Sequence, residues 1–365
     1  MIMKCGIVGL PNVGKSTLFN CLSNAKAQAA NFPFCTIEPN VGTVNVPDIR
    51  LQMLESLVDP EKVIPATVEI VDIAGLVKGA SKGEGLGNQF LGNIRECNAI
   101  LHVLRCFDND NIIHVDGSVD PLRDKETIDM ELQLKDLDSL EKRLEKVRKI
   151  SKTGDKEAIR ETEMAIGLKK HLESGKSVRS FNRSSEGSKW ITDYELITDK
   201  PILYVCNVDE SSAKDGNHYV DQVKLMASAE GSHVMHLAVA IESDIIELEN
   251  HDERSLFLED LGLTEPGVNR IVRAAYSMLN LQTYFTAGVK EVRAWTIKKG
   301  STAPQAAGVI HSDFEKGFIR AEVISYSDYI EFKNELAVKE AGRMRVEGKD
   351  YLIQDGDVVH FRFNV

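Results

Sequence analysis

The sequence predicts an α/β fold in which a parallel sheet carries a phosphate-binding loop. Between Lys4 and about Ile241, short apolar strands alternate with helical patterns, as in parallel sheets with crossover helices. The segment Gly9–Thr17 reads GLPNVGKST, in which two glycines flank four residues and are followed by Lys and Ser. A strand pattern precedes this segment and a helix pattern follows it, which is the setting that a phosphate loop requires.

Six strands are expected in the sheet, and several of them end at polar segments. Because the carboxyl ends of parallel strands meet at one edge of a sheet, these segments should converge on a single site. The second strand is parallel or, as an edge strand, antiparallel. The expected strands are Lys4–Val8, Thr43–Val46, Ala66–Val71, Ala99–Phe107, Ile202–Cys206 and Val234–Val239.

The phosphate loop should bind anions through its backbone. Gly9 and Gly14 let successive N–H groups point inward, and the helix that starts near Lys15 adds free N–H groups and a positive dipole end. Lys15 would contact the β- and γ-phosphates and is a candidate catalytic residue, while the Ser16 hydroxyl would ligate Mg²⁺. The alternative is a glycine-rich turn that binds nothing. The expected nucleotide-binding residues here are Asn12, Val13, Gly14, Lys15, Ser16 and Thr17.

Two further segments could sense a γ-phosphate. Thr36 is the one hydroxyl in the middle of the loop Asn31–Pro39, and it would complete the Mg²⁺ coordination; alternatively, it only caps a turn. Asp72 follows the third strand and would hold Mg²⁺ through water, while the Gly75 amide would approach the γ-phosphate. The stretch Gly75–Gly87 contains five glycines, which suits a switch loop or a plain flexible loop.

A base-recognition segment follows the fifth strand. Asn207 and Val208 begin the sequence NVDE, where GTPases carry Asn-Lys-x-Asp. The acid that would pair with guanine is replaced by Glu210, and Val208 cannot reproduce the packing and charge of lysine. Since a site built for paired hydrogen bonds loses selectivity when they are spoiled, we expect adenine to be accepted and guanine selectivity to be lost.

Between Asp129 and Gly175 the alternation of strands and helices stops. Apolar residues recur there at three- and four-residue steps, and Thr153–Asp155 interrupts them, which predicts an antiparallel helical hairpin. Its basic face would meet RNA phosphates or would simply be solvated. The segment Ser177–Lys189 should be a mobile loop. The basic residues are Lys142, Arg143, Lys146, Arg148, Lys149 and Lys152.

The last part of the chain shows a different pattern of predicted secondary structure. Asn250–Asn280 is helical in pattern, and short strands follow around a helix that Thr302 caps, which fits a small β-grasp module with a regulatory or docking role. The strands should be Gln282–Phe285, Val289–Ile297, Gly317–Ile324, Tyr351–Gln354 and Val358–Phe363.

Bulk composition excludes several classes of protein. The formal net charge of −12 over 365 residues argues against non-specific nucleic-acid binding by the whole surface. No apolar run approaches a membrane span and no signal pattern precedes the first strand, so we expect a cytoplasmic protein without membrane contact. The six cysteines lack CxxC spacing, which favours buried, reduced thiols.

These segments together resemble the YchF/Obg-like ATPases, a branch of the translation-factor-related P-loop GTPases that uses ATP. The resemblance implies an Obg-type nucleotide-binding domain (residues 1–128 and 196–280), a helical insertion (129–195) and a C-terminal TGS domain of ubiquitin-like β-grasp fold (281–365). It also implies ATP, Mg²⁺ and the ribosome, either its large subunit or the whole particle, as partners, with ribosomal RNA contacted by the hairpin or the TGS domain. The matching segments are Gly9–Thr17, Asn31–Asn40, Asp72–Phe90, Asn207–Glu210 and Gln282–Trp295.

Hydrolysis should be slow. Leu76 stands where Ras-like GTPases carry the glutamine that orients water, and leucine can neither hydrogen-bond nor transfer a proton. The resemblance makes His114, in the loop after the fourth strand, the candidate catalytic residue, reaching the site by loop movement. The alternative is that His114 is an ordinary surface residue.

Two classes of function remain open at this stage. The first is a ribosome-associated ATPase whose slow conversion of ATP to ADP and phosphate acts as a nucleotide-dependent switch. The second is a stress-related or metabolic ATPase that does not act mainly on ribosomes. A dual ATP/GTP hydrolase is a further alternative.

Overall fold

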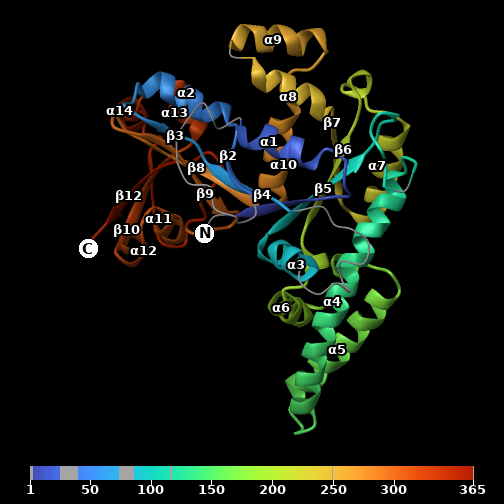
Figure 1. The fold of residues 1–365 in the computed structure, drawn as a ribbon. Coiled ribbons are helices and arrows are strands. Elements are labelled where there is room, and N and C mark those ends of the chain that lie inside the picture. Colours follow the sequence, from blue (N-terminus) through green and yellow to red (C-terminus); the bar gives the residue numbers. More distant parts are fainter. Residues whose placement is uncertain (1–2, 25–39, 74–85, 116, 249, 365) are drawn as a thin grey trace. The chain divides into compact units, whose positions relative to one another are not determined.

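The computed structural model describes residues 3–24, 40–73, 86–115, 117–248 and 250–364, and they form two compact units (Figure 1). The first unit contains Met3–Thr43 and Glu69–Ile271, and the second contains Val44–Val68 and Val272–Val365. The second unit therefore takes in a segment from near the N-terminus as well as the C-terminal part of the chain. The expected boundary at residue 281 does not include this earlier segment.

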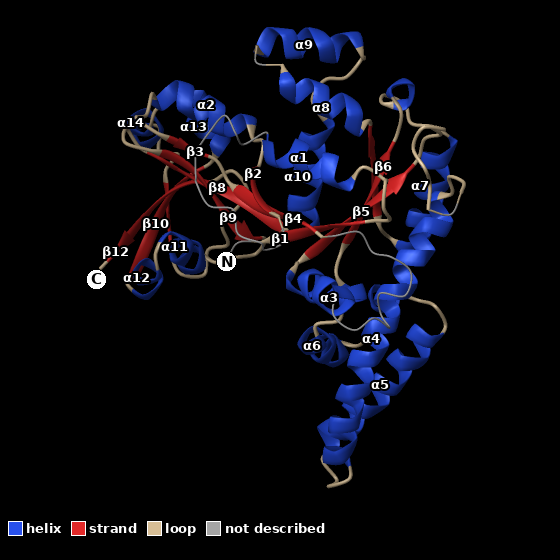
Figure 2. Ribbon diagram, viewed as in Figure 1, coloured by secondary structure: helices blue, strands red, loops and turns tan. Residues whose placement is uncertain are grey.

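A six-stranded sheet with the order β2-β4-β1-β5-β6-β7 organises the first unit. The pairs from β4 through β1, β5 and β6 to β7 are all parallel. All residues of β5 and β6 are buried, because helices cover both faces; Figure 2 shows α1 on one face and α3 on the other. The strands are β1 (Lys4–Val8), β2 (Val41–Asn45), β4 (Thr67–Asp72), β5 (Ala99–Arg105), β6 (Ile202–Asn207) and β7 (His233–Leu237).

Local sequence signals set the ends of the covering helices. At α7, the Asn217 side chain accepts from the backbone N–H groups of Tyr219 and Val220, and Gly231 ends the helix at φ 68°. The helix α10 continues across the boundary into the second unit. The helices are α1 (Lys15–Asn24), α3 (Leu86–Glu96), α7 (His218–Glu230), α8 (Val239–Glu247), α9 (His251–Asp260) and α10 (Gly267–Met278).

The predicted helical hairpin is present and extends away from the sheet of its own unit (Figure 1). It consists of α4 (Pro121–Ser151) and α5 (Lys156–Glu173), so it begins earlier than expected because Asp120 caps α4 and Pro121 opens it. Asp155 caps α5. A shared core holds the two helices together, and it contains Leu140, Leu144, Ala165, Leu168 and Leu172.

The expectation of a mobile loop over Ser177–Lys189 is wrong. A 3₁₀ turn covers Val178–Ser180, and α6 (Ser185–Tyr194) begins after a Ser184 cap. Val178 and Ile191 are buried in the hairpin core, which explains why a stretch rich in Ser, Arg and Gly still forms regular structure. Further 3₁₀ turns cover Ile197–Asp199 and Glu210–Ser212.

The second unit has the β-grasp arrangement, in which a hairpin is followed by a helix and returning strands. Its sheet has the order β11-β10-β12-β8-β9-β3, and α11 packs three alanines onto the core of this sheet. The strands are β3 (Val63–Ile64), β8 (Leu281–Ala287), β9 (Val292–Lys298), β10 (Phe318–Ile324), β11 (Arg345–Glu347) and β12 (Val358–Phe363). The helices are α2 (Ile49–Val58), α11 (Ala303–Ile310), α12 (Ser312–Lys316), α13 (Tyr326–Phe332) and α14 (Glu335–Glu340).

The prediction of a strand at Tyr351–Gln354 is wrong, since that stretch makes only an isolated bridge between Thr302 and Leu352. The sequence pattern alone does not assign α2 to this unit. Leu51 and Leu54 of α2 are buried, and Arg50 pairs with Asp355 at 2.8 Å, so α2 is an integral part of the second unit.

Candidate nucleotide-binding site

The phosphate loop lies between β1 and α1 and has the backbone conformation that its glycines permit. Gly9 and Gly14 have φ values of 156° and 96°. A Cβ atom at Gly9 would lie 2.6 Å from the Val103 carbonyl oxygen, and one at Gly14 would lie 2.5 Å from Asn207 Nδ2. Both positions therefore require glycine for space as well as for conformation.

Lys15 begins α1 and is buried, with 8% of its surface exposed. Its Nζ donates to the Leu10 carbonyl oxygen at 2.8 Å, so the ammonium group faces the loop's own backbone. Burial lowers the pKa of Lys15, and the nearby Asp72 carboxylate opposes that shift. The ammonium group is thus held inside the loop, in position to contact a bound phosphate group.

Ser16 and Asp72 meet at the carboxyl edge of the sheet. The Ser16 hydroxyl donates to Asp72 Oδ2 at 3.5 Å. Burial raises the pKa of Asp72, and Lys15 and the Ser16 hydroxyl oppose that rise. A hydroxyl and a carboxylate are hard oxygen ligands of the kind that Mg²⁺ prefers, so the pair fits the expected ion. Thr36 and Gly75, the other expected contributors, lie outside the described residues, as does Leu76.

The Asn207 side chain connects two loops through hydrogen bonds. Its Nδ2 donates to the Val13 carbonyl oxygen at 3.0 Å, and its Oδ1 accepts from the Val239 N–H at 3.1 Å. Val208 is buried, and its N–H donates to Leu237. Asn207 therefore fixes the phosphate loop against the start of α8, which is an indirect way to serve nucleotide binding.

The acidic residues after Val208 have different environments. Asp209 Oδ1 accepts from the Ser212 N–H at 3.2 Å and so caps the short turn over Glu210–Ser212. Glu210 is exposed. Of the two acids, Glu210 is the one whose carboxylate is not used by a cap.

His114 is buried, which contradicts the expectation of an ordinary surface residue. It is 8% exposed, and its Nε2 lies 2.8 Å from Asp124 Oδ2, near the start of α4. Arg123 also reaches Asp124, at 3.1 Å. The structure thus holds the imidazole against α4, while the adjacent Ile113 carbonyl accepts from Asn12 Nδ2 of the phosphate loop at 3.3 Å.

Arg105, which the sequence analysis did not single out, organises the loop that carries His114. Its guanidinium is 2% exposed and donates to the carbonyl oxygens of Phe107, Asn109 and Ile112 at 2.9–3.1 Å. The available signal was an arginine inside an otherwise apolar strand. Because a buried guanidinium must satisfy its donors, it predicts a loop wrapped around it.

Another buried histidine lies on β5. Neither ring nitrogen of His102 has a hydrogen-bond partner in the part of the chain that the structure describes. Burial, together with the positive charges of Lys125 and Arg179, lowers the pKa of His102 to about 3. His102 is therefore neutral at physiological pH and does not act as an acid or base there.

No helix among the described residues is long and apolar enough to cross a membrane. The model of the family described as "50S ribosome-binding GTPase" matches residues 4–149. The YchF-GTPase_C model, described as a protein of unknown function, matches residues 281–364. The first match covers the phosphate-loop part of the first unit together with Val44–Val68 of the second, and the other match covers the C-terminal part of the second unit.

Curated relatives match the chain over its whole length and theirs. Proteins named "Ribosome-binding ATPase YchF" are 58% identical in Haemophilus influenzae, 58% in Escherichia coli O157:H7 and 54% in Bacillus subtilis, with 100% of each chain covered. A solved structure titled a Schizosaccharomyces pombe YchF GTPase is 38% identical with a TM-score of 0.88, covering 99% of this chain and 97% of that one. The names of these relatives differ in the nucleotide, since the bacterial proteins are called ATPases and the Schizosaccharomyces pombe protein is called a GTPase.

Proposed function

The chain belongs to the YchF family of ribosome-binding ATPases, and on that premise we propose that it binds Mg-ATP in the Gly9–Thr17 loop and hydrolyses it slowly to ADP and phosphate. The nucleotide state sets its affinity for ribosomes, so it acts where ribosomes are, in the cytoplasm. The observation that carries the proposal is the Lys15 ammonium group, held inside a loop whose glycines leave no room for side chains.

Each residue around the phosphates has a separate task. The loop N–H groups from Asn12 to Thr17 bind the phosphate oxygens, and Lys15 neutralises charge on the β- and γ-phosphates. Ser16 and Asp72 hold Mg²⁺, which supplies charge neutralisation when bound. Thr36 and Gly75 add contacts only when a γ-phosphate is present.

His114 is the proposed catalytic group that replaces the missing glutamine. Asp124 holds its imidazole through Nε2, and we propose that His114 reaches an attacking water by a loop movement that breaks this hydrogen bond. Slow turnover follows, because breaking a buried hydrogen bond of this kind adds to the barrier. A partner that moves α4, which carries Asp124, would release His114 and accelerate hydrolysis.

The hairpin is the proposed RNA contact. Lys142 pairs with Asp138 and Arg143 pairs with Glu161. Lys146, Lys149 and Lys152 are exposed near the hairpin tip and have no ion pair within the described ranges of the chain. Such unpaired cations bind phosphates in a salt-dependent manner.

Calorimetry with Mg-ATP tests the nucleotide site. Lys15→Ala should lower ATP affinity at least about tenfold, because a charge-assisted contact to phosphate is lost. Lys4→Ala, at a half-buried lysine on β1 outside the loop, is the matched control and should bind like the wild type. Unchanged affinity in Lys15→Ala would place the nucleotide elsewhere.

A turnover assay separates the two classes of function. The switch predicts slow hydrolysis by the protein alone and faster hydrolysis with added ribosomes. A stress-related or metabolic ATPase predicts substantial turnover that ribosomes do not change. Running the assay with ATP and with GTP also tests the dual hydrolase.

A further inference from the structure

The sheet of the second unit opens between two of its central strands. β12 pairs with β10 along its whole length, from Val358 to Phe363. On its other side it pairs with β8 at one position only, Val358 with Phe285. Past Val358, the edge of β12 that faces β8 has no strand partner within the described residues, and such an edge offers free backbone N–H and C=O groups.

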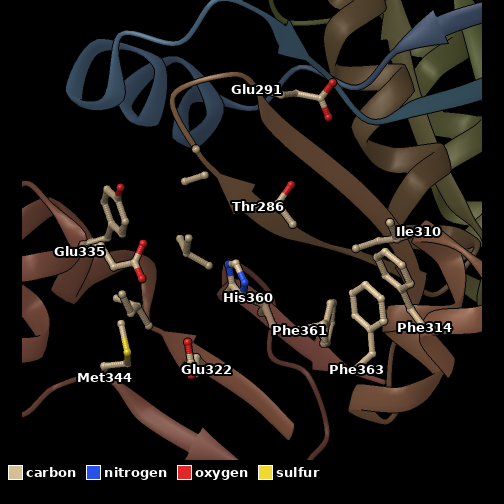
Figure 3. Close-up of a pocket in the computed structure, with 16 residues that line it drawn as sticks. Thr286, Glu291, Ile310, Phe314, Glu322, Glu335, Met344, His360, Phe361 and Phe363 are labelled. Atoms are coloured by element: carbon tan, nitrogen blue, oxygen red, sulfur yellow. The ribbon is translucent and has the colours of Figure 1, made fainter. Parts of the chain in front are cut away.

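A cavity of about 310 Å³ occupies this opening (Figure 3). Ala287 at the end of β8 lines it on one side, and Phe361 and Phe363 of β12 line it on the other. The Phe314 and Phe363 rings stack there with their centroids 3.7 Å apart. The opening therefore combines an unpaired strand edge with apolar walls, the two features that strand-adding peptides use.

The charges around the cavity are mostly acidic. Glu291, Glu322 and Glu335 line it, together with His360. Glu322 already pairs with Arg362 at 3.0 Å, and Glu291 lies 3.9 Å from Arg293. Glu335 is exposed and has neither a hydrogen bond nor an ion pair in the part of the chain that is described; Figure 3 shows it across the cavity from the two stacked phenylalanines. Arg362 interacts electrostatically with Glu335 but forms its ion pair with Glu322, so the Glu335 carboxylate still repels phosphate and attracts a cation.

We propose that this cavity binds an extended segment of a partner protein, which adds as a strand to the free edge of β12 and places a lysine or arginine beside Glu335. The apolar side chains of the segment fill the space against Phe361 and Phe363. The site lies in the second unit, so it goes beyond the proposed nucleotide function and gives the β-grasp module a protein ligand rather than an RNA ligand.

The test uses the full-length chain and a labelled synthetic peptide of five Lys-Val repeats, followed by fluorescence anisotropy. Glu335→Lys should weaken binding about tenfold, because it replaces an attraction by a repulsion. Glu340→Lys, at the exposed far end of the same helix α14 and outside the cavity lining, makes the same charge change and should alter binding less than about twofold. Ala287→Trp should abolish binding by filling the cavity.

Two further measurements test the strand addition itself. Bound peptide should slow hydrogen exchange at the backbone amides of Ala287 and Phe361, which face the opening. A peptide of the same sequence that is N-methylated on alternate residues loses half of its N–H donors, and it should bind at least about tenfold more weakly.

Several outcomes would overturn the proposal. Equal weakening by Glu335→Lys and Glu340→Lys would show non-specific attraction to an acidic protein, and absence of binding at about 1 mM peptide would show that the site is not used. Displacement of the peptide by oligouridylate would favour RNA as the ligand. A dimer that Ala287→Trp dissociates, measured by light scattering, would favour a second copy of the chain. Mg-ATP affinity should be unchanged in all three variants, so the nucleotide proposal stands or falls separately.

Discussion

At the scale of single residues, both ends of the Asn207 amide are engaged with protein backbone, at Val13 and Val239. Base selection therefore depends on its neighbours. Val208 is buried and apolar, while Glu210 carries an exposed carboxylate one carbon longer than the aspartate of guanine-binding sites. This combination favours adenine or an absence of preference, in line with the relatives named ATPases.

Restoring the guanine motif should shift the preference toward GTP. The double variant Val208→Lys, Glu210→Asp returns the acceptor geometry that pairs with guanine, and its ATP/GTP affinity ratio should fall about tenfold or more. Competition binding with both nucleotides measures the ratio. The single variant Glu210→Asp keeps Val208 and is therefore the control that separates the effect of the acid from the effect of burying a lysine. A hundredfold preference for GTP in the unmodified protein would contradict the premise.

His102 should make the protein less stable in mild acid. Its pKa is about 3 in the folded state against 6.5 in the unfolded chain, so below pH 6.5 the unfolded chain binds a proton that the folded protein does not. The free energy of unfolding should therefore drop by about 1–2 kcal/mol between pH 6.5 and pH 5 through this group. The variant His102→Gln should lack this pH-dependent part of the free energy of unfolding. Urea unfolding at the two pH values measures the difference. His218→Gln, at an exposed histidine, should keep the wild-type dependence.

The residues that sequence could predict are those whose chemistry is local. Gly9, Gly14 and Lys15 occupy fixed places in one short motif, and the structure places them at the strand–helix junction as expected. The pairing of His114 with Asp124 could not be predicted, because it depends on where α4 lies against the loop. The roles of His114 and Thr36 in catalysis and metal binding remain predictions.

At the scale of elements, one buried carboxylate holds α4 to the chain that re-enters the sheet. Asp136 is fully buried and accepts from the N–H groups of Ile197 and Thr198 and from the Thr198 hydroxyl, each at 2.7 Å. Burial raises the pKa of Asp136 while these donors oppose the rise. The base of the hairpin is thus fixed by a side chain rather than by a strand pairing.

Asp136→Ala should lower the free energy of unfolding by about 3 kcal/mol, because it leaves buried donors without an acceptor. Asp138→Ala removes a half-exposed carboxylate from the same helix and should change stability by less than about 0.5 kcal/mol. Chemical denaturation gives both values. Similar effects in the two variants would contradict the anchoring role of Asp136.

Elements were predictable where apolar periodicity is strong. The buried strands β5 and β6 were expected close to their observed bounds, and the apolar stripes of α4 and α5 predicted the hairpin, although α4 begins earlier than expected, at Pro121. The helix α6 was missed because its composition resembles a loop, although Trp190 and Ile191 are buried. The short strand β11 carries too few residues for a pattern to emerge.

At the scale of the whole molecule, the nucleotide should act through two loops. Residues 31–40 and 75–87 should exchange amide hydrogens more slowly with a Mg-ATP analogue than with Mg-ADP, since Thr36 and Gly75 gain contacts only from a γ-phosphate. Hydrogen exchange monitored by mass spectrometry measures this, with β11 of the second unit as an internal reference that should not respond. Equal protection in both states would make the metabolic-ATPase reading the stronger one.

The division into two units could not be predicted from sequence texture. The change to short strands after Leu281 is visible in the sequence, and the second unit does contain them. The helix α2 gives no such signal, because its membership depends on contacts with chain that lies far away in the sequence, such as the pair formed by Arg50 and Asp355.

The packing of α2 in the second unit has a consequence for synthesis of the chain. The helix α2 ends at Val58 and β8 begins at Leu281, so about 220 residues are translated between them. At the usual speed of translation, α2 leaves the ribosome roughly 10–45 s before the first strand that it packs against. During that interval the apolar face around Leu51 and Leu54 lacks its native cover. A nascent protein interrupted before Leu281 therefore carries this uncovered apolar face as an exposed site for chaperones.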